Sequence, residues 1–123
     1  MKRHYRVTWE DALESHAAAL EAGGCPGILN RGLIESALAR PYDGRHPLIH
    51  QKAAALVHSF AKNHGFADGN KRSALYVADL LIRRSGYRLS ANSQDVEDMI
   101  LAVVEDRMNY SSLEEWFKER LAR

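Results

Sequence analysis

The chain has 123 residues, of which 46% are hydrophobic and 27% are charged, a composition typical of one globular domain and not of a disordered segment. The 17 Lys and Arg residues nearly balance the 16 Asp and Glu residues, and the resulting net charge of +1 argues against a strongly basic nucleic-acid-binding protein. Cys25 is the single cysteine, which excludes an intrachain disulfide and fits a reducing compartment.

The chain shows no pattern of a membrane span or of a secretory signal. The longest uninterrupted apolar run, residues 99–104, is much too short to cross a bilayer. The basic start, residues 1–6, has no apolar stretch behind it. We therefore expect one domain over residues 1–123, located in the cytoplasm and without a membrane partner.

Apolar residues recur at helical spacing along most of the chain and predict six helices. The first begins after Thr8, which forms a capping box with Asp11, and it ends before the glycines at 23 and 24. The others are expected from Asn30 to before Pro41, over about 47–63 and 69–85, from Asn92 or Ser93, and from a capping box of Ser112 and Glu115 through Trp116, Phe117 and Leu121. Residues 87–89 form a short candidate strand. The fold class predicted is all-α, a compact bundle of about six helices.

One stretch between the third and fourth predicted helices departs from ordinary helix patterning. Residues 63–73, NHGFADGNKRS, hold a histidine, an acid, a Gly-Asn pair and two adjacent cations. Because the fourth helix would begin near Gly69, its first backbone N–H groups lack helical partners and form an anion site. Lys71 and Arg72 in that first turn oppose the helix dipole, at a cost of a few tenths of a kcal/mol or more, and a bound polyphosphate would reverse the sign of this term.

Two further side chains of this stretch suit phosphoryl transfer. Asp68 offers an oxygen ligand for Mg²⁺, and His64 offers a base that takes a proton from a hydroxyl nucleophile. Taken singly, His64 is better explained as a helix C-cap, Asp68 as an N-cap and Gly69 as a turn residue than as parts of a functional site. The combination with two misplaced cations favours a site that binds Mg²⁺ and transfers a phosphate group from a nucleotide.

Residues 64–72, HGFADGNKR, resemble the signature loop of the Fic/Doc superfamily, and in detail its Doc (death-on-curing) branch. Residues 32–41, GLIESALARP, the chain length and the helical pattern resemble the same branch. The resemblance implies a Fic-like helical fold and transfer from ATP to a hydroxyl of a target protein. It implies these roles: His64 as general base, Phe66 as the anchor of the loop, Asp68 as Mg²⁺ ligand, Gly69 and Asn70 as the anion-binding turn, and Lys71 and Arg72 as phosphate contacts.

Two positions differ from the pattern of adenylylating Fic enzymes. That pattern has glycine at the position of Lys71 and a second arginine at the position of Leu75. Both departures resemble the Doc branch, whose namesake transfers the γ-phosphoryl group. The resemblance therefore implies a kinase-type toxin of a type II toxin–antitoxin system, controlled by a cognate antitoxin, that modifies a translation elongation factor and stops translation and growth. An adenylyltransferase and a non-catalytic binding module of the same fold are the alternatives.

The resemblance also implies a flap that lines up the target segment. We expect it in the connector Tyr42, Asp43, Gly44 and Arg45 before the third helix, for which a plain solvated loop is an equal alternative. Gly65 stands where proline is common in the family, and we expect it to let the backbone of His64 flex.

Overall fold

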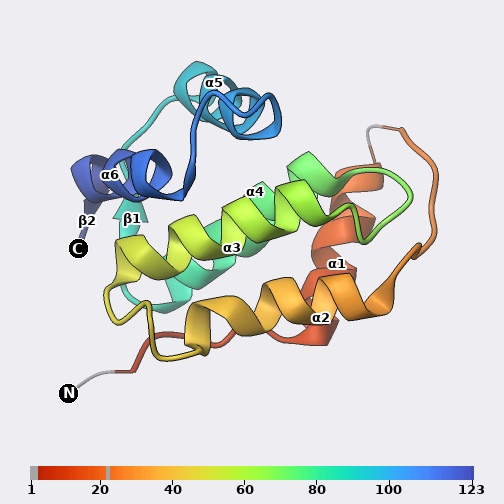
Figure 1. Ribbon diagram of the computed structural model, residues 1–123, viewed down its shortest axis with the longest axis horizontal. Helices are drawn as coiled ribbons and strands as arrows, with labels where there is room; N and C mark the ends of the chain where they lie inside the picture. Colours follow the sequence, from red (N-terminus) through yellow and green to blue (C-terminus); the bar gives the residue numbers. More distant parts are fainter. Residues whose placement is uncertain (1–2, 22) are drawn as a thin grey trace.

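The computed structural model describes residues 3–21 and 23–123, and its elements are almost all helical (Figure 1). The predicted all-α bundle of about six helices is confirmed. The helices are α1 (Trp9–Leu20), α2 (Arg31–Ala39), the short 3-10 helix η1 (Arg40–Tyr42), α3 (Ile49–Asn63), α4 (Asn70–Arg84), α5 (Ser93–Val104) and α6 (Tyr110–Arg120). In the described ranges no helix is long and apolar enough to cross a membrane.

Side-chain caps fix where the first helices begin. The Thr8 hydroxyl accepts a hydrogen bond from the Asp11 N–H at 3.0 Å, and the Asp11 carboxylate accepts one from the Thr8 N–H at 3.0 Å, so the predicted capping box is present. Asn30 caps α2 and Asn92 caps α5 with a side-chain oxygen that accepts a hydrogen bond from the N–H group three residues on. These starts are local properties of the sequence.

The start of α6 differs from the prediction. The side chain of Asn109 accepts a hydrogen bond from the Ser112 N–H at 2.9 Å, so the helix begins at Tyr110 and Ser112 lies inside its first turn. The predicted capping box of Ser112 and Glu115 is therefore wrong. Asn109 and Ser112 are both good cap residues three positions apart, and the earlier one lengthens the helix by almost a turn.

The candidate strand at 87–89 is present as β1 (Arg88–Leu89). It pairs antiparallel with β2 (Leu121–Ala122), with Leu89 opposite Leu121. Leu121 therefore leaves the last helix and joins a two-stranded ribbon. β2 was not predicted, because its two residues directly follow the helical pattern of α6 and carry too little pattern of their own.

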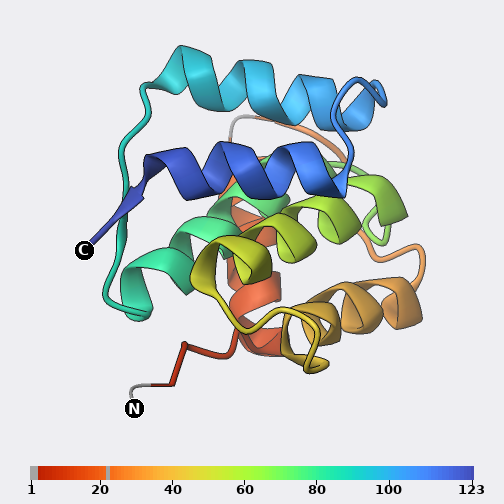
Figure 2. The ribbon, with the colours of Figure 1, turned by 60° about the vertical axis from the view of Figure 1, so that its left-hand side comes forward.

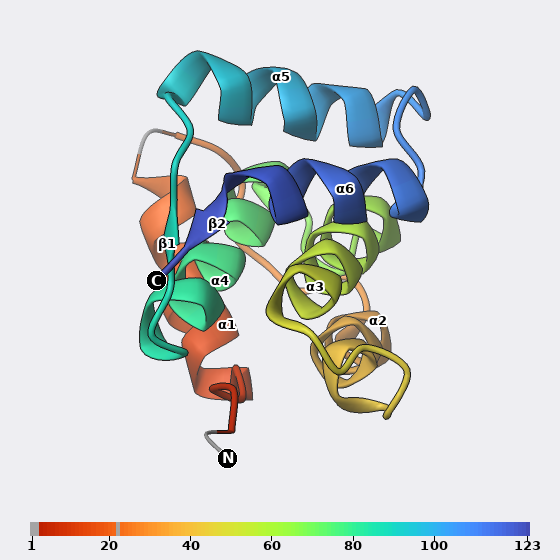
Figure 3. The same cartoon turned by 90° about the vertical axis from the view of Figure 1, so that its left-hand side faces the viewer.

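The centre of the fold is α3, which packs against α2, η1, α4, α5 and α6. Its buried residues include Leu56 and Val57, both at 0% exposure, and each such side chain contributes about 1.5–3 kcal/mol by burial. Figures 2 and 3 show α5 and α6 on one side of the α3–α4 pair and α1 and α2 on the other. The connection from α3 to α4 is thereby held between α1 and α2 at one end of the bundle.

Candidate active site in the loop between α3 and α4

The loop 64–69 begins and ends with left-handed backbone. His64 ends α3 with φ 50° and ψ 46°, and Gly69 opens α4 with φ 76°. Glycine adopts this conformation freely, whereas for histidine it costs roughly 1–2 kcal/mol. The surrounding contacts must hold His64 in place, and its side chain is exposed to solvent.

Gly65 fastens the loop to the segment before α2. Its carbonyl accepts hydrogen bonds from the Leu29 N–H at 2.9 Å and the Asn30 N–H at 3.0 Å. A Cβ atom at this position would lie 2.3 Å from Cγ1 of Ile34, so only glycine fits without rearrangement. The expectation that Gly65 lets the His64 backbone flex is therefore wrong, because packing and two hydrogen bonds fix it.

Phe66 fastens the same loop to the core. Its side chain is 1% exposed and its ring stacks on that of His16, with centroids 3.7 Å apart and planes 7° from parallel. The side-chain amide of Asn70 donates to the Phe66 carbonyl at 3.0 Å and accepts from the Phe66 N–H at 3.1 Å. The Asn70 side chain is therefore used inside the loop, and its backbone N–H is the group it offers to an anion.

Asp68 lies on the exposed side of the loop with its carboxylate held in place. Oδ1 accepts from the Gly69 N–H at 2.8 Å and Oδ2 accepts from the Cys25 N–H at 3.1 Å. These hydrogen bonds from Cys25 and Gly69, with smaller contributions from Arg72 and His16, lower the pKa of Asp68. The side chain is thus an oriented anion at neutral pH.

In the part of the chain that the structure describes, the first backbone N–H groups of α4 are free to bind a ligand. The first helical hydrogen bond runs from the Ser73 N–H to the Gly69 carbonyl at 2.9 Å, and the N–H groups of residues 70–72 find no partner within the described ranges. Lys71 and Arg72 are exposed in this turn. One Arg72 N–H donates to the Ala19 carbonyl at 3.3 Å, which leaves most of its donors available.

A cleft of about 560 Å³ opens beside this turn, between α4 and α5. Lys71, Arg72 and Leu75 form its α4 wall, and residues at the start of α5 form the other, among them Asn92, Ser93, Val96 and Glu97. Its volume is within the usual range of small-molecule sites. The place of the α5 residues in this cleft could not be predicted from the sequence, because only tertiary packing brings them to the loop.

Comparison with known proteins identifies the family of this chain. The family model described as "Fic/DOC family" matches residues 6–82, a span that includes the whole loop and the first turn of α4. The chain belongs to the Fic/DOC family. It is 36% identical over 88 residues to "Toxin Doc" of Mycolicibacterium smegmatis, a match that covers 68% of this chain and 66% of that protein. It is 30% identical over 113 residues to "Protein kinase doc" of Escherichia phage P1, covering 87% of this chain and 88% of that protein.

The connector expected to form a docking flap is not beside the Fic/DOC loop. Tyr42, Asp43, Gly44 and Arg45 precede α3, whereas His64 follows it, so the 15-residue helix separates them by about 22 Å (Figure 1). The Tyr42 hydroxyl accepts from the Val7 N–H at 2.9 Å and donates to the Tyr5 carbonyl at 2.7 Å. The connector therefore holds the N-terminal arm, which corrects the expectation of a flap at this place.

A different segment, residues 25–30, lies along the Fic/DOC loop. Ile28 forms a β-bridge with Phe66, and the Ala67 N–H donates to the Gly27 carbonyl at 2.9 Å. Ile28 and Leu29 are exposed, Leu29 to 70%. This segment was not predicted from the sequence, although the apolar pair Ile28 and Leu29 after Pro26 and Gly27 distinguishes it from an ordinary polar loop.

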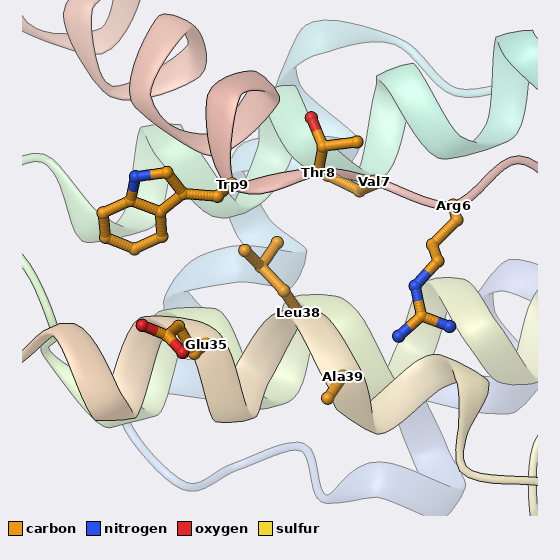
Figure 4. A pocket seen from close by; sticks show the side chains of 7 residues that line it. All are labelled: Arg6, Val7, Thr8, Trp9, Glu35, Leu38 and Ala39. Atoms are coloured by element: carbon orange, nitrogen blue, oxygen red, sulfur yellow. The ribbon is translucent and has the colours of Figure 1, made fainter.

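A second, smaller hollow of about 210 Å³ lies between the N-terminal arm and α2 (Figure 4). Its charged residues already have partners: Glu35 pairs with Arg31 at 2.6 Å, and the Arg6 guanidinium lies 4.8 Å from the centroid of the Tyr42 ring. We assign this hollow no function.

Proposed function

We propose that this chain is the toxin of a type II toxin–antitoxin system and that it transfers the γ-phosphoryl group of ATP to a hydroxyl of a target protein. One observation carries the proposal: a single loop presents exposed His64, the oriented Asp68 carboxylate and the open N-terminus of α4 beside a cleft of about 560 Å³. The name of one relative, "Toxin Doc", supports the role as a toxin, and the name of the other, "Protein kinase doc", supports phosphoryl transfer.

The cleft suits a nucleotide whose phosphates face α4. The open N–H groups of residues 70–72 and the positive end of the helix dipole favour an anion there. The side chains of Lys71 and Arg72 lie in that turn and supply the positive charge that a polyphosphate needs. Leu75 stands on the α4 wall of the cleft and adds no charge. Because Leu75 offers no second positive charge, the phosphate nearest the loop is held mainly by the first turn of α4. We take this arrangement to favour transfer of the γ-phosphoryl group.

Asp68 fits Mg²⁺ in the manner of nucleotide-using enzymes. Among the described residues, no group of three or more histidine, cysteine or acidic side chains is arranged to hold a metal ion. A single oriented carboxylate suffices for Mg²⁺, because this ion binds through one or two carboxylates together with substrate phosphates. When bound, Mg²⁺ neutralises charge on the phosphates; the chain's own part is to hold the carboxylate in one direction.

His64 acts as the general base in this proposal. It takes the proton of a target hydroxyl, whose oxygen forms a bond to the γ-phosphorus while the bond from that phosphorus to the bridging oxygen breaks. The products are a phosphorylated protein and ADP, and the proton stays on His64. Such transfer depends chiefly on positioning and electrostatics. The fixed backbone at Gly65 therefore contributes to catalysis by holding the adjacent His64 in position.

The target docks beside His64, and the exposed pair Ile28 and Leu29 offers it an apolar surface. By resemblance the target is a translation elongation factor, and its modification stops translation. Control comes from a cognate antitoxin in trans. The reaction takes place in the cytoplasm and needs no direct nucleic-acid binding.

The test is a labelling experiment with purified protein, Mg²⁺ and a cell lysate. One reaction receives α-labelled ATP and one receives γ-labelled ATP, each beside His64→Ala as the matched inactive control. We expect one labelled protein band from γ-labelled ATP, absent with His64→Ala. In cells, expression of the wild type should arrest growth and expression of His64→Ala should not.

The other outcomes separate the alternatives. A band from α-labelled ATP would show adenylylation, and the weight given to Lys71 and Leu75 would be misplaced. Growth arrest by His64→Ala, with no His64-dependent label from either nucleotide, would show that the chain acts by binding alone and would overturn the enzymatic proposal.

A further inference from the structure

His16 contacts the loop 64–69 although it is more than 40 residues away in the sequence. It lies on α1, is 7% exposed, and its Nε2 lies 2.9 Å from the main-chain carbonyl oxygen of Asp68. A carbonyl only accepts, so Nε2 carries the proton in this contact. The same imidazole stacks on Phe66, and a Cβ at Gly69 would lie 3.6 Å from its Cδ2. One side chain thus contacts three of the last four loop residues.

These contacts leave Asp68 with little freedom. Its carbonyl is held by His16, and its two carboxylate oxygens are held by the N–H groups of Gly69 and Cys25. Gly24 packs so closely that a Cβ there would lie 3.0 Å from Oδ2. Among these restraints, only that of His16 comes from a side chain. His16 lies on α1, which contributes no other residue to the proposed site.

We propose that His16 is a positioning residue that fixes the direction of the Asp68 carboxylate through the Asp68 main chain. This inference rests on the proposed function, in which Asp68 is the Mg²⁺ ligand and the direction of its carboxylate therefore matters. Groups that orient a metal ligand typically change metal affinity or activity by about ten- to a hundredfold when removed.

Two substitutions separate the hydrogen bond from the stacking. His16→Phe keeps an aromatic ring against Phe66 and removes the donor to Asp68. His16→Gln keeps an N–H donor at a similar reach and removes the aromatic ring. His46 supplies the matched control, because it has the same 7% exposure and lies before α3, away from the loop. His46→Phe and His46→Gln report what a buried histidine contributes to stability alone.

Two measurements test the inference on the full chain. The first is the affinity for a non-hydrolysable ATP analogue with and without Mg²⁺. We expect His16→Phe to reduce the enhancement by Mg²⁺ about tenfold or more, while His16→Gln and both His46 variants keep most of it. The second is amide hydrogen exchange at Gly69, whose N–H donates to Asp68. We expect about tenfold faster exchange in His16→Phe, with protection largely restored in His16→Gln.

Each other outcome has a defined meaning. If His16→Phe keeps both the Mg²⁺ enhancement and the slow exchange at Gly69, His16 does not position Asp68. If the His16 and His46 variants change alike, the effect is one of general stability and the inference is also overturned. If the wild type shows no Mg²⁺ enhancement, the proposed function of Asp68 fails, and the exchange at Gly69 alone decides whether His16 holds the carboxylate.

Discussion

The side-chain amide of Asn70 forms hydrogen bonds to both main-chain groups of Phe66, donating to the carbonyl at 3.0 Å and accepting from the N–H at 3.1 Å. These two bonds close the loop 66–70 just before the first turn of α4. Both partners are buried, so neither main-chain group of Phe66 can turn to water if Asn70 is removed. The contact therefore links the fold of the loop to the position of the anion site.

Asn70→Ala should destabilise the protein and impair labelling. Each buried main-chain group left unpaired costs about 1–3 kcal/mol, so urea unfolding should show a loss of at least this size. Labelling from γ-labelled ATP should fall even where the variant is fully folded, because the N–H groups of α4 lose their register with Asp68. Asn63→Ala is the control, since its side chain donates an exposed, long bond of 3.4 Å to Leu33. It should change stability by less than about 0.5 kcal/mol.

Gly65→Ala should be destabilising because of one specific clash. Its new Cβ would lie 2.3 Å from Cγ1 of Ile34, a side chain that is buried and cannot swing into solvent. Overpacking of this kind costs about 1–3 kcal/mol. Ile34→Ala removes Cγ1, so the double variant should lose less stability than the sum of the two single losses. Strict additivity in chemical denaturation would show that the clash is not the cause.

Asp68 should give a recognisable pH dependence of stability. The hydrogen bonds from Cys25 and Gly69 lower its pKa in the folded state below the unfolded value of about 3.9. For an acid with a depressed pKa, the stabilisation is fully present above the unfolded pKa and is lost as the pH falls through the folded pKa. The difference in unfolding free energy between wild type and Asp68→Asn should therefore be constant near neutral pH and narrow progressively below about pH 5. Urea titrations over this range measure it, and a difference that does not change with pH would contradict the assignment.

The helices and the loop residues could be predicted because their signals are contiguous in the sequence. Thr8 and Asp11 form their capping box within four residues, and the motif at 64–72 places its charged groups within nine. The competing caps Asn109 and Ser112 show the limit of such reasoning, because both satisfy the same local rule. Only the packing of the whole helix decides between them.

The parts that sequence reasoning missed depend on contacts between distant segments. Asn70 was expected in the anion-binding turn, and the structure shows that its side chain faces inward to Phe66. His16 has ordinary helical surroundings in the sequence, and only the fold brings it against Asp68. The same holds for residues 25–30, whose pairing with the loop follows from the path between α1 and α2.

The placement of target docking can be tested with one variant on each side of α3. Tyr42→Phe removes the hydroxyl that bonds to Val7 and Tyr5, and it should lower the unfolding free energy by about 1–3 kcal/mol. Because Tyr42 lies at the far end of α3 from His64, the KM for the target protein should stay unchanged in this variant.

Leu29→Asp should leave the stability almost unchanged and should raise the KM. Leu29 is 70% exposed, so its loss should change stability by less than about 0.5 kcal/mol, yet a charge beside His64 should raise the KM for the target severalfold. Steady-state labelling with increasing target concentration gives both values. A raised KM in Tyr42→Phe together with an unchanged one in Leu29→Asp would return the docking site to the connector before α3.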